Sequence, residues 1–311
     1  MEVFTNINNI KIEQSAICVG TFDGLHCGHK VVINKTIEQA KKLGLKSLVF
    51  TFWPHPHEVI FPDKQVYYLN TFQEKIDLFA ELGIDYLILF PFNKEFANKT
   101  SKEFIQDFLL EKLKMKFFVI GYDHQFGKER EGKYEKMIDC SKELNFGLER
   151  IEQQAVSGEY ASSTKIRKLI KNGNLELANK LLGYTYFTSG EVISGKQIGT
   201  KIGFPTANIN IAPNKIMPQT GVYAVKIQHN NKLYNGMANL GFKPTVEDKK
   251  ELSLEVHLFN FNKNIYSQKI KVLFYKKIRV EHKFENLDTL KDQLNQDKKT
   301  CIKYFDTINL D

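Results

Sequence analysis

The sequence predicts an α/β domain with a doubly wound parallel sheet, followed by a small antiparallel β-barrel and a C-terminal helix. Two observations support this prediction. The first part of the 311-residue chain alternates short apolar runs with stretches of helical period. The last part alternates apolar and polar residues at period 2 instead. The period changes at Gly183, so we expect one domain over residues 1–183 and a second over 184–311.

Five apolar runs are expected to form the parallel strands of the first domain, because strands buried on both faces contain few polar residues. They cover residues 15–20, 46–52, 84–90, 116–121 and 147–152. After Gly28, apolar residues recur at helical spacing up to Gly44, a typical glycine C-cap. Two short helices, TKIRKLI and LELANKLL, are expected to close this domain at Gly183.

The second domain is predicted from alternation. Residues 252–258 (LSLEVHL) place leucine and valine on one face of a strand and polar residues on the other. Residues 206–211 (TANINI) alternate in the same way, and the runs 221–227 and 232–240 flank a QHNN turn. These strands indicate a small antiparallel barrel, and residues 284–305 are expected to form a final helix.

Composition narrows the class of protein. No apolar stretch is long enough to span a bilayer, and the first residues lack the pattern of a signal peptide. Four cysteines, Cys18, Cys27, Cys140 and Cys301, are scattered without a CxxC pair. We therefore expect a cytoplasmic protein with free thiols, and neither a disulfide framework nor a zinc ribbon.

The charge is uneven along the chain. The net charge is +8, of which residues up to Gly183 carry +1 and the remaining residues carry +7. A basic second domain indicates an anionic partner, either phosphate groups or nucleic acid. Solvated surface lysines explain the same excess without any function, and both interpretations stay open.

The first candidate site follows the first predicted strand, in the segment TFDGLHCGHK. Gly20, Gly24 and Gly28 let the backbone approach a ligand closely. The following helix offers free N–H groups and the positive end of its dipole. His26 and His29 are expected to add mobile positive charge, so this loop is a candidate site for a nucleotide phosphate.

Zinc is the main chemical alternative, because several side chains nearby are of ligand type. They are His26, Cys27, His29, His55 and His57. No carboxylate or CxxC spacing supports such a site. The chain also lacks GxGxxG and GxxxxGK[ST], so neither of those phosphate-binding loops is expected.

Four strings in this part of the chain carry a family resemblance. GTFDGLHCGH resembles the GxFDGxHxGH signature of the nucleotidyltransferase superfamily, a Rossmann-like fold. SSTKIR (162–167), TFWPHP (51–56) and GYDHQFGKEREG (121–132) resemble segments of bacterial FAD synthetases. In the last string His124 stands where that family usually has phenylalanine.

This resemblance implies a site for FMN adenylyl transfer. The catalytic residues it implies are His26, His29 and Arg167. Those implied for ATP binding are Gly20, Phe22, Asp23, Gly24, Gly28, Ser162, Ser163 and Thr164. Asp123 and Phe126 are implied for flavin binding. The three hydroxyl side chains at 162–164 could equally serve as plain helix caps.

The second candidate site lies in the barrel, where glycines 190, 195, 199 and 203 precede the polar strand face of Thr206 and Asn208. Glycines in strands mark bulges, barrel corners or close approach of a ligand. A threonine hydroxyl and an asparagine carbonyl oxygen on one face could hold Mg²⁺ together with nucleotide phosphates. The sequence thus indicates a magnesium nucleotide site.

Here too the strings resemble a known family. GFPTAN resembles the riboflavin kinase signature, and four later segments follow in the family's order. These are GVYA (221–224), ANLGFKPT (238–245), LEVHLFNF (254–261) and IRVEHKF (278–284). Where the family has Gly-Arg this chain has Gly199, Thr200 and Lys201, so a phosphate contact is either lost or moved to Lys201.

The resemblance implies the following roles. Glu255 would be the base, although a cross-strand partner for a lysine is its plain structural alternative. Thr206 and Asn208 would hold the metal. ATP would contact Gly195, Lys201, Gly203, Pro205, Thr206 and Asn208. The flavin would contact Arg279, Glu281 and Phe284.

Both motif sets together resemble the bifunctional bacterial riboflavin kinases and FAD synthetases. The resemblance implies phosphorylation of riboflavin to FMN and adenylylation of FMN to FAD, with ATP as co-substrate and Mg²⁺ as cofactor. Partners would be small molecules, with no membrane and no nucleic acid, and a weak homo-oligomer is left open. One alternative is a flavin- or RNA-binding regulator on the same folds. Another, a class I aminoacyl-tRNA synthetase fragment, shares the HxGH loop but has no place for GFPTAN.

Overall fold

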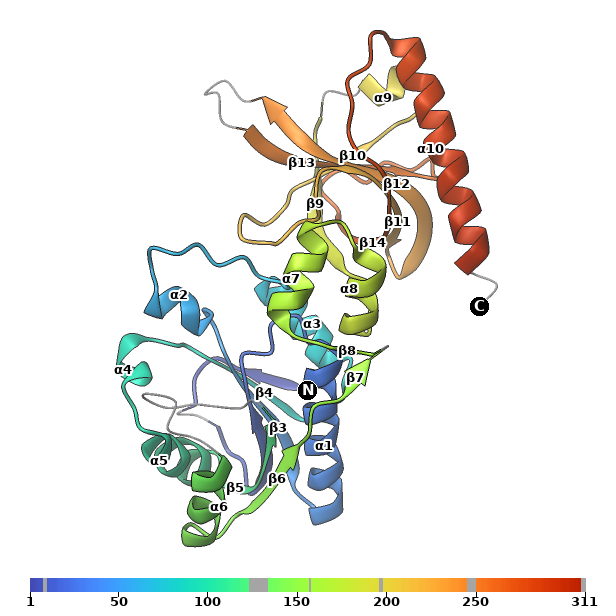
Figure 1. Ribbon diagram of the computed structural model, residues 1–311. Coiled ribbons are helices and arrows are strands. Elements are labelled where there is room, and N and C mark those ends of the chain that lie inside the picture. The colour runs from blue at the N-terminus through green and yellow to red at the C-terminus, as the bar shows by residue number, and fades with distance from the viewer. Residues whose placement is uncertain (8–9, 123–133, 157, 196–197, 245–249, 309–311) are drawn as a thin grey trace. The chain divides into compact units, whose positions relative to one another are not determined.

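The computed structural model describes residues 1–308 except 8–9, 123–133, 157, 196–197 and 245–249 (Figure 1). The chain forms two compact units, Met1–Ser162 and Ser163–Asp311. This division lies about twenty residues before the predicted boundary at Gly183. The difference concerns only the two short helices that precede Gly183.

A parallel six-stranded sheet forms the centre of the first unit, in the order β1-β4-β3-β2-β5-β6. Its strands are β1 (Glu2–Phe4), β2 (Ser15–Val19), β3 (Lys46–Phe52), β4 (Tyr86–Phe90), β5 (Met115–Gly121) and β6 (Gly147–Ile151). The five predicted strands are confirmed, and three-residue β1 was too short to predict. All five residues of β2 are buried, as expected for a central strand covered on both faces.

Helices cover both faces of this sheet, as the doubly wound prediction requires (Figure 1). Those of the first unit are α1 (Cys27–Leu43), α2 (Pro56–Ile60), α3 (Phe72–Ala80), α4 (Lys94–Ala97), α5 (Ser101–Glu103), the π-helix η1 (Phe104–Lys112) and α6 (Tyr134–Glu143). α1 packs on β2, β3 and β5 and ends at Gly44, whose φ of 66° is the predicted left-handed cap. η1 packs on β5 and supplies Phe104 and Phe108 to the apolar core. A short hairpin, β7 (Ala155–Val156) and β8 (Glu159–Tyr160), ends the unit.

The second unit is a closed antiparallel barrel in the order β10-β13-β12-β11-β14-β9. Its strands are β9 (Phe187–Ile193), β10 (Ala207–Ile209), β11 (Gly221–His229), β12 (Lys232–Pro244), β13 (Lys250–Leu258) and β14 (Lys269–Arg279). The short helix α9 (Ile198–Lys201) lies between β9 and β10. The final helix α10 (Leu287–Ile308) packs against β11, β12 and β14, where it buries Cys301 and Phe305. The predicted barrel and C-terminal helix are confirmed.

Two helices precede the barrel, α7 (Ser163–Lys171) and α8 (Leu175–Leu182). Asn179 of α8 explains why they belong to the second unit. Its amide nitrogen donates to the Phe274 carbonyl of β14 at 3.0 Å, and its amide oxygen accepts from the Tyr186 N–H at 2.7 Å. Pattern alone could not assign these helices, because an apolar helix face does not show which neighbour covers it.

In the described part of the chain, none of the helices has both the length and the hydropathy that crossing a bilayer requires.

Candidate active sites

The first candidate site lies at the carboxyl ends of the central strands of the parallel sheet, where the strand order reverses. β2 lies between β3 and β5, and the chain leaves its carboxyl end through residues 20–26 into α1. Ligands of open α/β sheets bind at this switch point. The loop turns sharply, with left-handed φ angles of 45° at Phe22, 83° at Gly24 and 39° at Leu25. A Cβ on Gly24 would lie 2.5 Å from Leu69, so the turn also needs glycine for space.

His26 and His29 form one stacked pair at the start of α1. Their ring centroids are 3.6 Å apart at an interplanar angle of 18°. His26 is the N-cap, and its Nδ1 accepts a hydrogen bond from the His29 backbone N–H at 3.4 Å. Phe22 packs edge-on against His29, and the buried Nδ1 of His29 makes no hydrogen bond to the described residues. The pair therefore lies at the N-terminus of α1, with one ring nitrogen of His29 not hydrogen-bonded to the described residues.

Burial keeps both imidazoles neutral in the ligand-free chain. It lowers the pKa of His26 to about 4, although the nearby Asp23 carboxylate acts in the opposite direction. Burial also lowers the pKa of His29 well below its usual value, and the neighbouring His26 and Lys75 act in the same direction. The expectation that these histidines supply mobile positive charge is therefore wrong for the free protein. They act as neutral hydrogen-bonding groups at neutral pH.

This protonation state predicts an acid-sensitive first unit. Because the unfolded His26 takes up a proton near pH 6.5 and the folded one near pH 4, folding stability falls as pH decreases through that window. The loss from His26 amounts to about 3 kcal/mol at most. His26→Asn keeps an N-cap side chain but removes this titration. Urea unfolding followed by Trp53 fluorescence, at pH 7 and pH 4.5, measures both proteins.

Trp53, the sole tryptophan of the chain, stacks on Tyr68 and therefore reports on the first unit. The variant should lose less stability than the unmodified chain between pH 7 and 4.5. Parallel losses in the two proteins would contradict the burial of a neutral His26.

Two buried charged residues hold the loop between β2 and α1 in place. The Asp23 carboxylate accepts from the Leu69 N–H at 3.1 and 3.3 Å. The Lys75 ammonium, on α3, donates to the Thr21 carbonyl at 2.6 Å and to Thr51 Oγ1 at 2.9 Å. Burial lowers the pKa of Lys75 to about 8. Asp23, predicted to bind ATP, thus fixes the loop onto its neighbours, and Lys75 is a supporting residue that sequence analysis missed.

The other residues predicted for this site do not lie near the histidines within the first unit. Ser162 ends the first unit, and Ser163, Thr164 and Arg167 lie on α7 in the second. Their association with the histidine pair stays a prediction. Asp123, His124 and Phe126 lie outside the described residues.

Zinc ligation gains no support from the geometry. His55 caps α2, and its Nδ1 accepts from the His57 N–H at 3.1 Å. Within the described ranges, no three His, Cys, Asp or Glu side chains gather closely enough to hold a metal ion.

The second candidate site is a pocket of about 330 Å³ on the second unit. One row of cross-strand partners crosses this side of the barrel, running through Asn208, Glu255, Asn239, Val222 and Arg279. Directly opposed residues share a face, so these side chains point to the same side. Among the residues predicted from sequence, five line the pocket: Thr206, Glu255, Arg279, Glu281 and Phe284. Gly199 of α9, Ile202 just after it, and Leu290 and Leu294 in the first turns of α10 complete the walls.

At the edge of this pocket, Asn208 and Glu255 share one cation. The Lys243 ammonium, from β12, donates to Asn208 Oδ1 at 2.5 Å and lies 3.3 Å from Glu255 Oε1. A Cβ on Gly195 would lie 2.1 Å from the Asn208 amide nitrogen, so only glycine leaves room for this side chain. Glu255 therefore does have the lysine partner of the structural alternative, while its carboxylate also lines the pocket.

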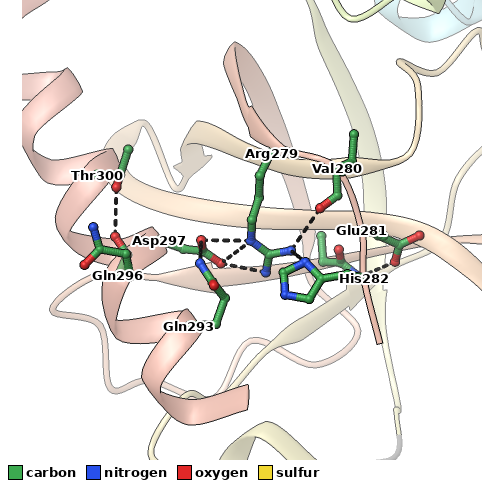
Figure 2. A network of polar contacts seen from close by, with 9 residues as sticks. Arg279, Val280, Glu281, His282, Gln293, Gln296, Asp297 and Thr300 are labelled. Carbon is green, nitrogen blue, oxygen red and sulfur yellow. Dashed lines mark hydrogen bonds and ion pairs between the residues drawn. The ribbon is translucent and has the colours of Figure 1, made fainter. Parts of the chain in front are cut away.

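Arg279 anchors the opposite wall (Figure 2). Its guanidinium donates from Nε to Asp297 Oδ1 at 2.9 Å and from a terminal nitrogen to Oδ2 at 2.8 Å. Asp297 is 1% exposed on α10 and also accepts from Gln293 Nε2 at 2.9 Å. The other terminal nitrogen of Arg279 donates to the Val280 carbonyl at 3.0 Å. Its charge is thus neutralised within the protein, and it lies 5.7 Å from the centre of the Phe284 ring.

Glu281 and His257 are also held by polar contacts. The Asn239 amide donates to Glu281 Oε1 at 3.1 Å, and a Cβ on Gly241 would collide with this carboxylate. His257 Nδ1 bonds to the Pro205 carbonyl at 2.8 Å, and burial lowers its pKa. Gly203 takes a left-handed φ of 85°. Lys201 is exposed at the end of α9 and lies outside the pocket lining.

Two protein-family models match the chain in succession. The model described as FAD synthetase matches residues 9–165, and the model described as riboflavin kinase matches residues 182–305.

Curated relatives match over nearly the whole length. One from Bacillus subtilis (strain 168) is 40% identical and covers 96% of both chains. One from Buchnera aphidicola subsp. Schizaphis graminum (strain Sg) is 38% identical, over 99% of this chain and 100% of the relative. One from Escherichia coli (strain K12) is 36% identical over 96% of both. All three are named bifunctional riboflavin kinase/FMN adenylyltransferase.

A solved structure has a similar fold over almost the entire chain. It is titled as a macrolide-efflux protein from Streptococcus pneumoniae, is 29% identical and has a TM-score of 0.87. It covers 96% of this chain and 98% of its own. The efflux named in that title concerns that protein.

Proposed function

This chain belongs to the family of bifunctional riboflavin kinases/FMN adenylyltransferases, and we propose that it makes FAD from riboflavin in two steps. The barrel domain phosphorylates riboflavin, and the N-terminal domain adenylylates the FMN formed. The observation that carries the proposal is the barrel pocket lined by Glu255 and Thr206, with Asn208 paired to Glu255 on the neighbouring strand. The proposed catalytic domains are residues 1–183 and 184–311, in keeping with family matches that end at 165 and begin at 182.

In the first step, the 5′ hydroxyl oxygen of riboflavin attacks the γ-phosphorus of ATP. A new O–P bond forms, the bond from the γ-phosphorus to the β,γ-bridging oxygen breaks, and ADP leaves with that electron pair. Glu255 accepts the hydroxyl proton. Glu281 and Phe284 hold the flavin, while Arg279 fixes the segment that carries them through its bond to Asp297.

Thr206 and Asn208 are proposed to hold Mg²⁺. A hydroxyl and a carboxamide oxygen are hard ligands that this ion accepts. Asn208 Oδ1 already bonds to a cationic group, the Lys243 ammonium, at 2.5 Å. When bound, Mg²⁺ would neutralise charge on the nucleotide phosphates. Three residues before this strand are also proposed to lie against ATP, namely Gly195, Gly203 and Pro205. Lys201 is a further predicted contact.

In the second step, a phosphate oxygen of FMN attacks the α-phosphorus of another ATP. The bond from the α-phosphorus to the α,β-bridging oxygen breaks, and pyrophosphate leaves with the electron pair. The ring N–H groups of His26 and His29 and the start of α1 stabilise the charge that develops on the α-phosphate. Ser162, Ser163, Thr164 and Arg167 are proposed to reach the same phosphates, and Asp123 and Phe126 the flavin.

Two parallel incubations of the purified chain test this function, one with riboflavin, ATP and Mg²⁺ and one with FMN, ATP and Mg²⁺. Chromatography over time should show FMN before FAD in the first mixture and FAD in the second. If FAD forms in the mixture with FMN but not in the mixture with riboflavin, the barrel lacks kinase activity. Absence of turnover in both mixtures would favour the flavin- or RNA-binding regulator instead.

Small-molecule substrates and four free cysteines are in keeping with a cytoplasmic location.

A further inference from the structure

We propose that Lys243 is the cation that binds the nucleotide phosphates in the barrel site. This role rests on the proposed kinase function, since it requires ATP to lie beside Asn208 and Glu255. From the sequence, the phosphate contact made by the family's arginine was expected to be either lost or moved to Lys201. The contacts of Lys243, on strand β12, favour this residue instead.

Lys243 is positioned by the strand that also carries Asn239. Asn239, Gly241 and Lys243 alternate along β12 and therefore share one face. The Glu281 carboxylate fills the space beside Gly241, and Lys243 directs its side chain toward Asn208 of β10 and Glu255 of β13. Its ammonium contacts Asn208 Oδ1 at 2.5 Å and Glu255 Oε1 at 3.3 Å. It thus bridges the proposed metal ligand and the proposed base, where the γ-phosphate must be held.

The basic side chains that line the pocket already have partners within the protein. Among the described residues that line the pocket, the basic ones are Arg279, His257 and His282. Arg279 is paired with the buried carboxylate of Asp297, and a terminal nitrogen of Arg279 also contacts His282 at 3.2 Å. His257 bonds to a backbone carbonyl, and burial favours its neutral form. Among the described residues, the Lys243 ammonium contacts both Asn208 and Glu255, so phosphate groups that enter beside Asn208 meet its positive charge there.

The observed ion pair is one that can be exchanged at low cost. The side chains of Lys243 and Glu255 are 37% and 34% exposed, and pairs of this kind contribute little to folding stability. A triphosphate offers several charged acceptor oxygens, which bind an ammonium more strongly than one amide oxygen does. On binding, the ammonium can exchange Asn208 for phosphate and leave Asn208 Oδ1 available to the metal.

Inhibition of FMN formation by two competitors tests this role. ADP carries phosphates, whereas adenosine offers only the base and sugar. In Lys243→Met the KM for ATP and the Ki for ADP should rise about tenfold, which corresponds to the loss of one charged hydrogen bond. The Ki for adenosine and the rate of FAD formation from FMN should not change. Lys243→Arg should recover most of the affinity for ADP, because it restores the charge.

Lys232→Met is the matched control, since this exposed lysine lies at the other end of β12. It should behave like the unmodified chain. The proposal is overturned if Lys201→Met gives the predicted pattern and Lys243→Met does not. Equal weakening of ADP and adenosine in Lys243→Met overturns it too, because that result means a damaged pocket. If Glu255→Gln and Asn208→Ala retain full FMN formation, the kinase site itself is misassigned, whatever the Lys243 variants show.

Discussion

Glu255→Gln is expected to lower the rate of FMN formation by about 10²- to 10⁴-fold, the usual contribution of a general base. Glutamine keeps the size of the side chain but cannot accept the hydroxyl proton. FAD formation from supplied FMN should stay unchanged, because the histidine loop lies in the other unit. Separate assays with riboflavin and with FMN as substrate measure the two rates.

Glu191→Gln provides the matched control. Glu191 is an exposed glutamate on β9 of the same barrel, and its variant should keep both rates. Thermal unfolding of both variants shows whether the fold is retained. Undiminished kinase activity in Glu255→Gln would leave Glu255 only as a structural partner of Lys243.

His29→Ala is expected to have the opposite effect. It removes a ring that stacks on His26 and that we place against the α-phosphate, so FAD formation should fall about 10²- to 10³-fold, as when one transition-state donor is lost. FMN formation from riboflavin should continue at the original rate. Accumulation of FMN in a mixture of riboflavin and ATP is the direct measurement.

His57→Ala controls for the loss of a histidine from the first unit. His57 is exposed on α2, and its replacement should change neither activity. Trp53 fluorescence checks that the first unit of each variant is folded. Loss of both activities in a folded His29→Ala protein would contradict two independent sites.

The backbone of both sites was predictable from local pattern. Strands covered on both faces are largely apolar, and for that reason the runs that form β2, β3, β4 and β5 were located to within two residues. The edge strand β6, whose residues are half-buried, was located equally well. Gly44 and Gly183 mark helix ends because a left-handed C-cap favours glycine. These signals depend on neighbours in sequence, and they fixed the loops that carry His26 and Thr206.

Charged residues that support the sites were missed, because their partners lie far away in sequence. Lys75 contacts Thr21 and Thr51, and nothing in its own segment indicates that contact. Asp297 offered a weak signal. It falls at four-residue spacing before Cys301 and Phe305, and so sits within the buried stripe of the final helix. A carboxylate in such a stripe indicates a buried cation, here Arg279.

The sequence by itself determined the two fold types, their order and the motifs that border each site, since these follow from periodicity, turn residues and short strings. Only the tertiary structure decided the charge state of His26, the neutralisation of Arg279 by Asp297 and the position of Lys243 between Asn208 and Glu255. The physical reason is that charge and pKa depend on burial and on the groups packed nearby. Those neighbours are brought together by folding and are not adjacent in the chain.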